Sequence, residues 1–176
     1  MRTLFGLSVP SLRVRGRDSA RRVADQDRLL DAYASAVESL SPSISLQIGV
    51  TWRDTIDGVV QTGAKWDKAK IAWATSGAVA ATVLAPLLTA VNAADVYVDA
   101  ETILGLEAAA AAAGLRPIEG GRLTLRPFPS VTARRLATRV DGLIVAPWPR
   151  VFADLRTVGV RGEEAAEHLR EVVRDR

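Results

Sequence analysis

The sequence predicts an α/β fold, in which one central mixed sheet of about four to six strands alternates with helices and a C-terminal helical hairpin closes the chain. Short apolar runs typical of strands alternate with segments whose apolar residues recur at helical spacing, which favours a largely buried sheet. Six consecutive alanines at 108–113 add strong helix formers with small side chains that allow close packing. The predicted strands are 46–50, 70–75, 95–98, 122–126 and 142–146.

The first predicted helix lies in the N-terminal part of the chain. Asp18 or Ser19 can cap it, because either side chain accepts hydrogen bonds from the free N–H groups of a first helical turn. Ser41 and Pro42 end it. Its apolar face can dock on the rest of the protein and consists of Val23, Leu29, Leu30, Tyr33 and Val37.

Two longer helices are expected over 54–68 and 101–113. The first contains Gly58 and Gly63, each of which costs about 1 kcal/mol relative to alanine in a helix interior. The second holds the alanine run and ends at Gly114. Both follow predicted strands, as the α/β alternation requires.

The pair Ser76-Gly77 joins the strand at 70–75 to a helix predicted over 78–88. The N-terminus of a helix presents free N–H groups to an anion. Ser76 and Gly77 are therefore candidate anion-binding residues.

The direction of the strands depends on a turn at Gly120-Gly121. If these glycines form a tight turn, 115–118 and 122–126 make a hairpin and the sheet is mixed. Without that turn a parallel sheet stays open. A short helix is expected over 131–138, before the last strand.

The segment 146–176 predicts two helices separated by Gly159. Glu163 and Glu164 fall in the first turn of the second helix, where carboxylates favour the positive end of the helix dipole. Both helices have an apolar stripe, which indicates that they pack on the domain. The stripes are Val151, Phe152 and Leu155 in the first helix, and Ala165, Ala166, Leu169, Val172 and Val173 in the second.

Composition excludes several classes of site. The chain has no cysteine and one histidine, so disulfides are excluded and a metal centre of the usual His and Cys type is disfavoured. We expect neither a metal nor another cofactor. The N-terminal apolar run is too short for a signal peptide, and no stretch reaches the roughly 20 apolar residues of a membrane span. We therefore expect a cytoplasmic protein without membrane contact.

The formal net charge of +3 is unevenly distributed, and both ends of the chain are basic. Positive side chains spaced along one face can contact nucleic-acid phosphates without reading sequence. The alternative is a flexible arm followed by a solvated helix face, since termini are often disordered. The densest basic cluster, and the candidate nucleic-acid-binding set, is Arg13, Arg15, Arg17, Arg21 and Arg22.

Three enzyme hypotheses do not fit the spacing of the polar residues. Nucleotidyl transfer requires two carboxylates that share metal ions, but Asp95 and Asp99 are four strand residues apart, roughly 13 Å. A nuclease of the restriction-enzyme type requires a carboxylate and a lysine two residues apart, and Asp67 and Lys70 are three apart. The only histidine, His168, lies among glutamates on the last helix, so a hydrolase triad is disfavoured.

Four segments together resemble a known family. They are 71–81 (IAWATSGAVAA), 94–99 (ADVYVD), 126–128 (RPF) and 152–169, which contains FADL, a glycine and RGEEAAEHL. Their order is similar to that in AbiEi-type antitoxins of bacterial type IV toxin–antitoxin systems. The resemblance runs from about residue 70 to residue 173 and rests on packing patterns.

The resemblance implies a non-enzymatic antitoxin whose functional partner is a nucleotidyltransferase-like toxin that it does not bind stably. Family members usually carry an N-terminal winged helix that binds operator DNA and represses transcription, followed by a C-terminal antitoxin domain. Only about 45 residues precede Leu46 here, with one helical run instead of the three helices and hairpin of a winged helix.

We accordingly divide the chain into a basic N-terminal arm and helix (1–45) and an α/β antitoxin-like domain (46–176). The predicted function is that of an antitoxin that can also act as a transcriptional autoregulator. Two alternatives stay open at this point. One is a nucleotidyltransferase-like or nuclease-like enzyme remnant, and the other is an orphan DNA-associated regulator.

Overall fold

The computed structural model describes residues 25–40, 44–87 and 90–175. Its centre is one seven-stranded sheet with the strand order β4-β1-β5-β3-β2-β7-β6. Pairs β3/β5 and β2/β7 are parallel and the other four pairs are antiparallel. The strands are β1 (Leu46–Gly49), β2 (Trp73–Ser76), β3 (Ala94–Val98), β4 (Arg116–Pro117), β5 (Leu123–Pro127), β6 (Thr138–Val140) and β7 (Leu143–Val145).

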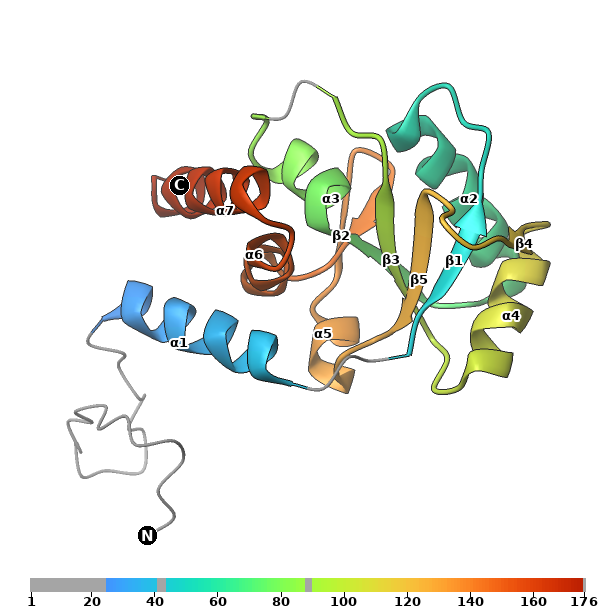
Figure 1. The fold of residues 1–176 in the computed structure, drawn as a ribbon, viewed down its shortest axis with the longest axis horizontal. Coiled ribbons are helices and arrows are strands. Elements are labelled where there is room, and N and C mark those ends of the chain that lie inside the picture. The colour runs from blue at the N-terminus through green and yellow to red at the C-terminus, as the bar shows by residue number, and fades with distance from the viewer. Residues whose placement is uncertain (1–24, 41–43, 88–89, 176) are drawn as a thin grey trace, which may run out of the picture.

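Helices cover both faces of this sheet. Helices α2 and α4 lie on one face, and α3, α6, α7 and α1 lie on the other, as Figure 1 shows from the edge of the sheet. None of the helices within the described ranges is long and apolar enough to cross a bilayer. The helices are α1 (Gln26–Ser39), α2 (Thr55–Ala69), α3 (Gly77–Leu84), α4 (Ile103–Ala112), α5 (Val131–Arg135), α6 (Trp148–Arg156) and α7 (Val160–Arg174).

The predicted α/β fold, its mixed sheet and its closing pair of helices are confirmed. The sheet has seven strands instead of about four to six because two edge strands are very short. Strand β4 has two residues and β6 has three, too few to produce a recognisable alternation of apolar and polar residues. The core extends through all layers, and its largest fully buried side chains include Trp66, Trp73, Phe152, Ile48 and Leu106.

The two glycines inside α2 are explained by tryptophan packing. A Cβ at Gly63 would lie 2.1 Å from the ring of Trp73, and a Cβ at Gly58 would lie 2.1 Å from the ring of Trp52. Each aromatic ring therefore rests directly on the helix backbone. The helix extends over nearly the predicted range, and the Asp54 carboxylate caps it by accepting from the N–H of Asp57 at 2.8 Å.

The alanine run in α4 allows α2 to approach closely. Trp66 of α2 is fully buried, and its Nε1–H donates to the carbonyl of Ala109 at 2.8 Å. Lys65 also reaches α4, where its ammonium donates to the carbonyl of Ala113 at 2.9 Å. Small side chains on α4 expose the helix backbone to these donors, so the run contributes packing and hydrogen bonding together.

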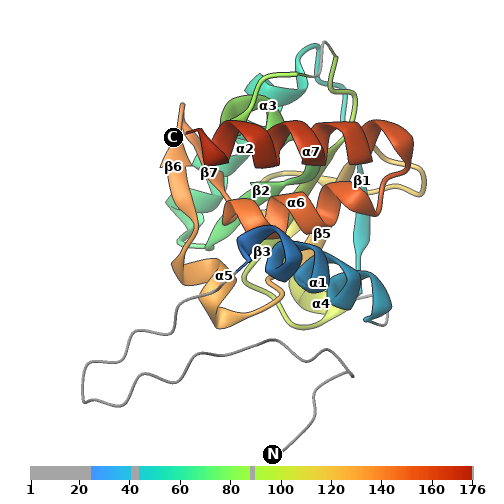
Figure 2. The same ribbon diagram turned by 90° about the vertical axis from the view of Figure 1, so that its left-hand side faces the viewer.

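The C-terminal helices α6 and α7 and the N-terminal helix α1 form one layer. Figure 2 shows the three helices stacked in front of the sheet, with α6 in the middle. Helix α1 buries Leu30 and Ala34 in the common core, so the predicted docking of the N-terminal helix is confirmed. Leu29 and Tyr33 stay partly exposed beside this contact.

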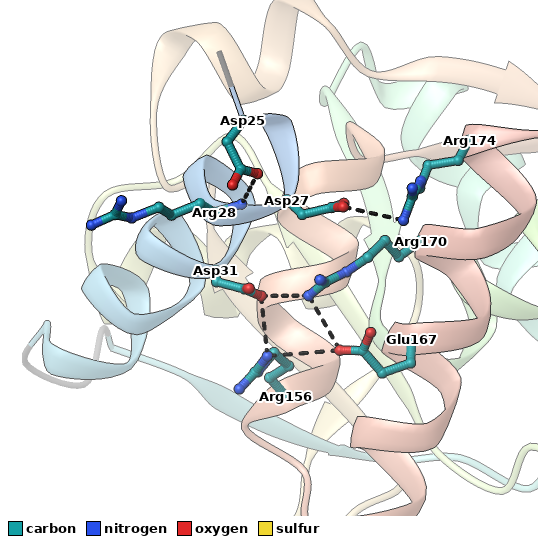
Figure 3. A network of polar contacts seen from close by, with 8 residues as sticks. All are labelled: Asp25, Asp27, Arg28, Asp31, Arg156, Glu167, Arg170 and Arg174. Carbon is teal, nitrogen blue, oxygen red and sulfur yellow. Dashed lines mark hydrogen bonds and ion pairs between the residues drawn. The ribbon is translucent and has the colours of Figure 1, made fainter. Parts of the chain in front are cut away.

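Ion pairs add to the docking of α1, as Figure 3 shows. The carboxylate of Asp31 lies between two guanidinium groups, one from α6 and one from α7. Such partly exposed pairs contribute little individually, but they set the orientation of α1 on its neighbours. The pairs are Asp27 with Arg174 (3.1 Å), Asp31 with Arg156 (3.4 Å) and with Arg170, and Glu167 with Arg170 (3.2 Å) and Arg156 (3.8 Å).

Of the two alternatives at Gly120-Gly121, the hairpin does not form. Strands β4 and β5 do not pair with each other; they pair with the two sides of β1, so β1 separates them. The connection between them passes very close to the β1 backbone, because a Cβ at Gly121 would lie 2.1 Å from the carbonyl oxygen of Ile48. A turn is closed by the N–H of Gly121 donating to the carbonyl of Ile118 at 3.1 Å, but glycine at position 121 permits a crossing over β1 rather than a hairpin.

Three element boundaries also differ from the prediction. Helix α1 begins after Asp25, whose carboxylate accepts from the N–H of Arg28, while Asp18 and Ser19 lie outside the described residues. Helix α3 ends at Leu84, before Pro86, because a proline disfavours helical geometry in the residue ahead of it. Helix α5 ends at Arg135 and β6 follows it.

The hairpin β6–β7 was missed although its turn has a clear signal. Asp141 and Gly142 both have positive φ, 47° and 83°. An Asp-Gly pair of this kind forms the two-residue turn that matches the twist of paired strands. The helix predicted over 131–138 overlaps β6 at Thr138 only, and three residues are too few to show the alternation of a strand.

Candidate functional site

The face of the sheet beneath α6 carries a set of polar side chains. Alternation along β3 places Asp95 and Tyr97 on this face and the valines on the opposite one. The strand register sets Ser76 of β2 opposite Asp95 and Arg126 of β5 opposite Tyr97. Four polar residues from three strands thus gather under one helix.

Asp154 of α6 is the centre of this polar set. Its residue is only 8% exposed, and its carboxylate accepts three hydrogen bonds. Ser76 Oγ donates at 2.5 Å, Tyr97 Oη donates at 2.6 Å, and the Arg150 guanidinium donates at 2.8 Å. A buried carboxylate is stable only when it is paired and hydrogen-bonded in this way.

Tyr97 and Arg150 are also bonded to each other. Arg150 Nε donates to Tyr97 Oη at 2.9 Å, and its guanidinium carbon lies 5.5 Å from the centre of the Tyr97 ring. Burial and the adjacent Asp154 charge raise the pKa of Tyr97 far above its ordinary value. Burial lowers the pKa of Arg150, but Asp154 and Tyr97 outweigh it and the net shift is upward. The phenol therefore stays neutral and the guanidinium stays charged.

Asp95 forms a second ion pair beside this network. Its carboxylate lies 3.4 Å from Arg126 and against the start of α3, since a Cβ at Gly77 would lie 3.3 Å from Asp95 Oδ2. Burial raises the pKa of Asp95, Arg126 opposes that shift, and the charge of Asp154 adds to it. The positive φ of Gly77, 57°, turns the chain from β2 into α3 at this point.

A pocket of about 500 Å³ opens next to the network. Tyr97, Arg150 and Asp154 form its inner wall. Phe128, which stacks on Tyr97 with ring centres 5.9 Å apart, lines it together with Arg126. The remaining lining residues are Val37, Glu38 and Leu40 from the end of α1, Pro127, Pro129 and Thr157.

The two sets of site residues predicted from the sequence have different outcomes. Ser76 and Gly77 lie at the start of α3, as expected, but the Ser76 hydroxyl donates to Asp154 and does not cap the helix. The protein's own carboxylates, Asp154 and Asp95, therefore occupy the surroundings of this helix start. The basic set Arg13, Arg15, Arg17, Arg21 and Arg22 lies outside the described residues.

The three aspartates considered for metal or nuclease chemistry each belong to a local ion pair. Asp99 pairs with Arg134 at 2.7 Å, while Asp95 pairs with Arg126. Asp67 accepts from Trp73 Nε1 at 2.9 Å and pairs with Arg139 at 3.0 Å. Within the described ranges, no group of three or more His, Cys, Asp or Glu side chains could hold a metal ion.

Sequence reasoning missed Tyr97, Arg150 and Asp154. One signal was present in the alternation of residues 94–99, which sets polar side chains on a single strand face. The spacing of Arg150 and Asp154, four apart on a helix, indicates an ion pair but does not show that it is buried. Burial arises because α6 is covered by the sheet, α1, α3 and α7 together.

Comparison with known proteins adds no assignment to this site. No protein-family model matches the chain, and neither a curated protein nor a solved structure matches it.

Proposed function

We propose that this chain is a non-enzymatic, antitoxin-like protein of a type IV toxin–antitoxin system. One observation carries the proposal: the four segments that resemble AbiEi-type antitoxins, far apart in the sequence, meet in the network around Asp154. The segment 71–81 contributes Ser76, and 94–99 contributes Asp95 and Tyr97. The segments 126–128 and 152–169 contribute Arg126, Phe128 and Asp154.

This convergence gives the resemblance a physical basis. The four segments also fill the core, because their strands place side chains on both faces of the sheet. In addition, each segment supplies a side chain to one polar cluster and its pocket. Such a site supports a functional proposal more strongly than similar helix and strand patterns do, because function resides in sites rather than in folds.

The protonation states in the network favour recognition over catalysis. General acid–base catalysis requires a group whose pKa lies near the working pH. Burial moves the pKa of Tyr97 away from neutrality, and Arg150 is held in its charged form. Asp154 accepts from three donors of the protein itself, which fits a structural role for its carboxylate.

The proposal is tested by growth of cells that express a nucleotidyltransferase-like toxin encoded beside this gene. We expect co-expression of the chain to restore growth, and affinity-tagged toxin not to retain it. Tyr97→Phe removes one donor to Asp154 with little change of shape, and we expect reduced rescue. Tyr33→Phe on the exposed side of α1 is the matched control and should rescue fully. No rescue by the unmodified chain would refute the proposal.

Autoregulation through operator DNA is a separate part of the proposal. It rests on the basic residues that precede α1. Fluorescence anisotropy with the promoter duplex and a scrambled duplex, at several salt concentrations, measures selective binding. Removal of residues 1–17 should abolish that binding, and unchanged affinity after the deletion would show that the arm does not carry it.

A further inference from the structure

The pocket beside Asp154 lies where α/β proteins commonly bind small molecules. Strands β3 and β5 are parallel neighbours, and the residues at or just after their carboxyl ends, Tyr97, Pro127 and Phe128, line it. The C-terminal end of α1 lies at the same edge of the sheet, the lower one in Figure 1, and lines the pocket there. Ligands of open α/β sheets bind outside the carboxyl ends of strands, and the volume of about 500 Å³ suits a small organic molecule.

The hydrogen-bond donors that remain in this pocket belong to two arginines. An arginine carries five N–H donors. Among the described residues, the only ion pair or hydrogen bond of the Arg126 side chain is the one with Asp95 at 3.4 Å. Arg150 uses Nε for Tyr97 and Nη2 for Asp154, which leaves further N–H groups. The Asp154 carboxylate is already paired with Ser76, Tyr97 and Arg150, so the remaining N–H groups of the two arginines are suited to a ligand oxyanion.

The other wall of the pocket is aromatic and apolar. Phe128 is half-buried and stacked on Tyr97, and Pro127 and Pro129 flank it. A flat ring lying against Phe128 would continue this stack. At the rim, the exposed carboxylate of Glu38 can accept hydrogen bonds from hydroxyl groups. The pocket therefore offers partners for an oxyanion, a flat ring and hydroxyl groups. A nucleotide carries all three groups on one small molecule.

We propose that this pocket binds a nucleoside monophosphate, with its phosphate on Arg126 and Arg150 and its base against Phe128. The ribose hydroxyls then face Glu38. This inference goes beyond the antitoxin proposal and does not depend on it. Binding can occur in a chain that fails to rescue growth, and rescue can occur without a nucleotide.

Asp95 gives the inference a distinctive consequence. Its carboxylate pairs with Arg126, so it competes with a ligand phosphate for the same guanidinium. Neutralising it should release Arg126 to the ligand. We therefore expect Asp95→Asn to strengthen binding about threefold, whereas damage to a purely structural pair would weaken it.

The experiment is isothermal titration calorimetry of the full chain with AMP, GMP, CMP and UMP, in a buffer without phosphate. Inorganic phosphate and the neutral nucleoside adenosine are titrated separately, to measure binding of the oxyanion alone and of the base with its ribose alone. We expect at least one mononucleotide to bind about tenfold more tightly than either fragment. Equal binding of phosphate would reduce the site to a simple anion site and would overturn the nucleotide assignment.

Variants locate the binding in this pocket. Arg126→Leu should weaken binding about tenfold or more, and Phe128→Ala about fivefold, while Arg126→Lys should retain part of the affinity. The matched control is Arg134→Leu, which removes an arginine of similar exposure (46%, against 38% for Arg126) that is paired with Asp99 outside the pocket. Circular dichroism verifies that each variant is folded. Absence of binding by all four mononucleotides, or equal losses in Arg126→Leu and Arg134→Leu, would overturn the proposal.

Discussion

Both faces of the sheet are covered by helices, but the contacts differ in kind. Beneath α2 and α4 the contact is mainly apolar, with Trp66 and Trp73 packed 5.9 Å apart between ring centres. Beneath α6 the contact surrounds the charged pair Arg150 and Asp154. The first face depends on the shape and volume of large side chains, and the second on complete pairing of polar groups. Substitutions on the two faces should therefore behave differently.

The largest effect is expected at Trp66. It is fully buried and its indole N–H donates to Ala109, so Trp66→Ala removes packing and leaves a cavity. We expect a loss of about 4 kcal/mol in the free energy of unfolding, measured by urea denaturation. Trp52→Ala, at a half-buried tryptophan beside the same helix, is the control and should cost clearly less. If Trp66→Ala and Trp52→Ala lower the free energy of unfolding equally, tight packing does not determine the stability of this face.

Asp154 tests the polar face. Asp154→Ala leaves Arg150 buried without its partner, and we expect a loss of about 3 kcal/mol in the free energy of unfolding. A second substitution should recover part of this loss. The double variant with Asp154→Leu and Arg150→Met replaces the pair by apolar side chains and should lose about half as much. If the double variant is less stable than Asp154→Ala, pairing is not the main contribution of this network.

The same contrast explains which features could be predicted from the sequence. The alternation of strands and helices, the helix at α2 and the closing helices follow from local periodicity. The pairing of β4 and β5 with β1 does not, because it depends on a crossing over Ile48 that only the assembled sheet imposes. The network around Asp154 was missed for a related reason. An aspartate on an amphipathic helix is expected to face solvent unless a second layer covers it.

A smaller effect distinguishes the two glycines of α2. Gly63→Ala would bring a methyl group within 2.1 Å of the ring of buried Trp73, which cannot move without disturbing the core. We expect a loss of about 2 kcal/mol in the free energy of unfolding. Gly58 meets the half-buried Trp52, whose ring can shift toward solvent. There the helix propensity of alanine offsets the crowding, and a change within about 1 kcal/mol is expected from chemical denaturation.

The smallest effect concerns the dependence of stability on pH. Burial raises the pKa of Asp95 above its ordinary value of 3.8, against the opposing charge of Arg126. The folded chain thus binds this proton more tightly than the unfolded chain, so the group favours folding below that value, and its contribution is lost as pH rises through the folded pKa. In scanning calorimetry, the Tm of the unmodified chain should therefore fall relative to that of Asp95→Asn as the pH rises from about 3.8 through the folded pKa of Asp95. Arg126→Leu, which removes the opposing charge, should make the dependence steeper. If Tm depends on pH in the same way for the unmodified chain and Asp95→Asn, Asp95 is as well solvated in the folded chain as in the unfolded one. Asp95 would then not belong to the buried polar network around Asp154.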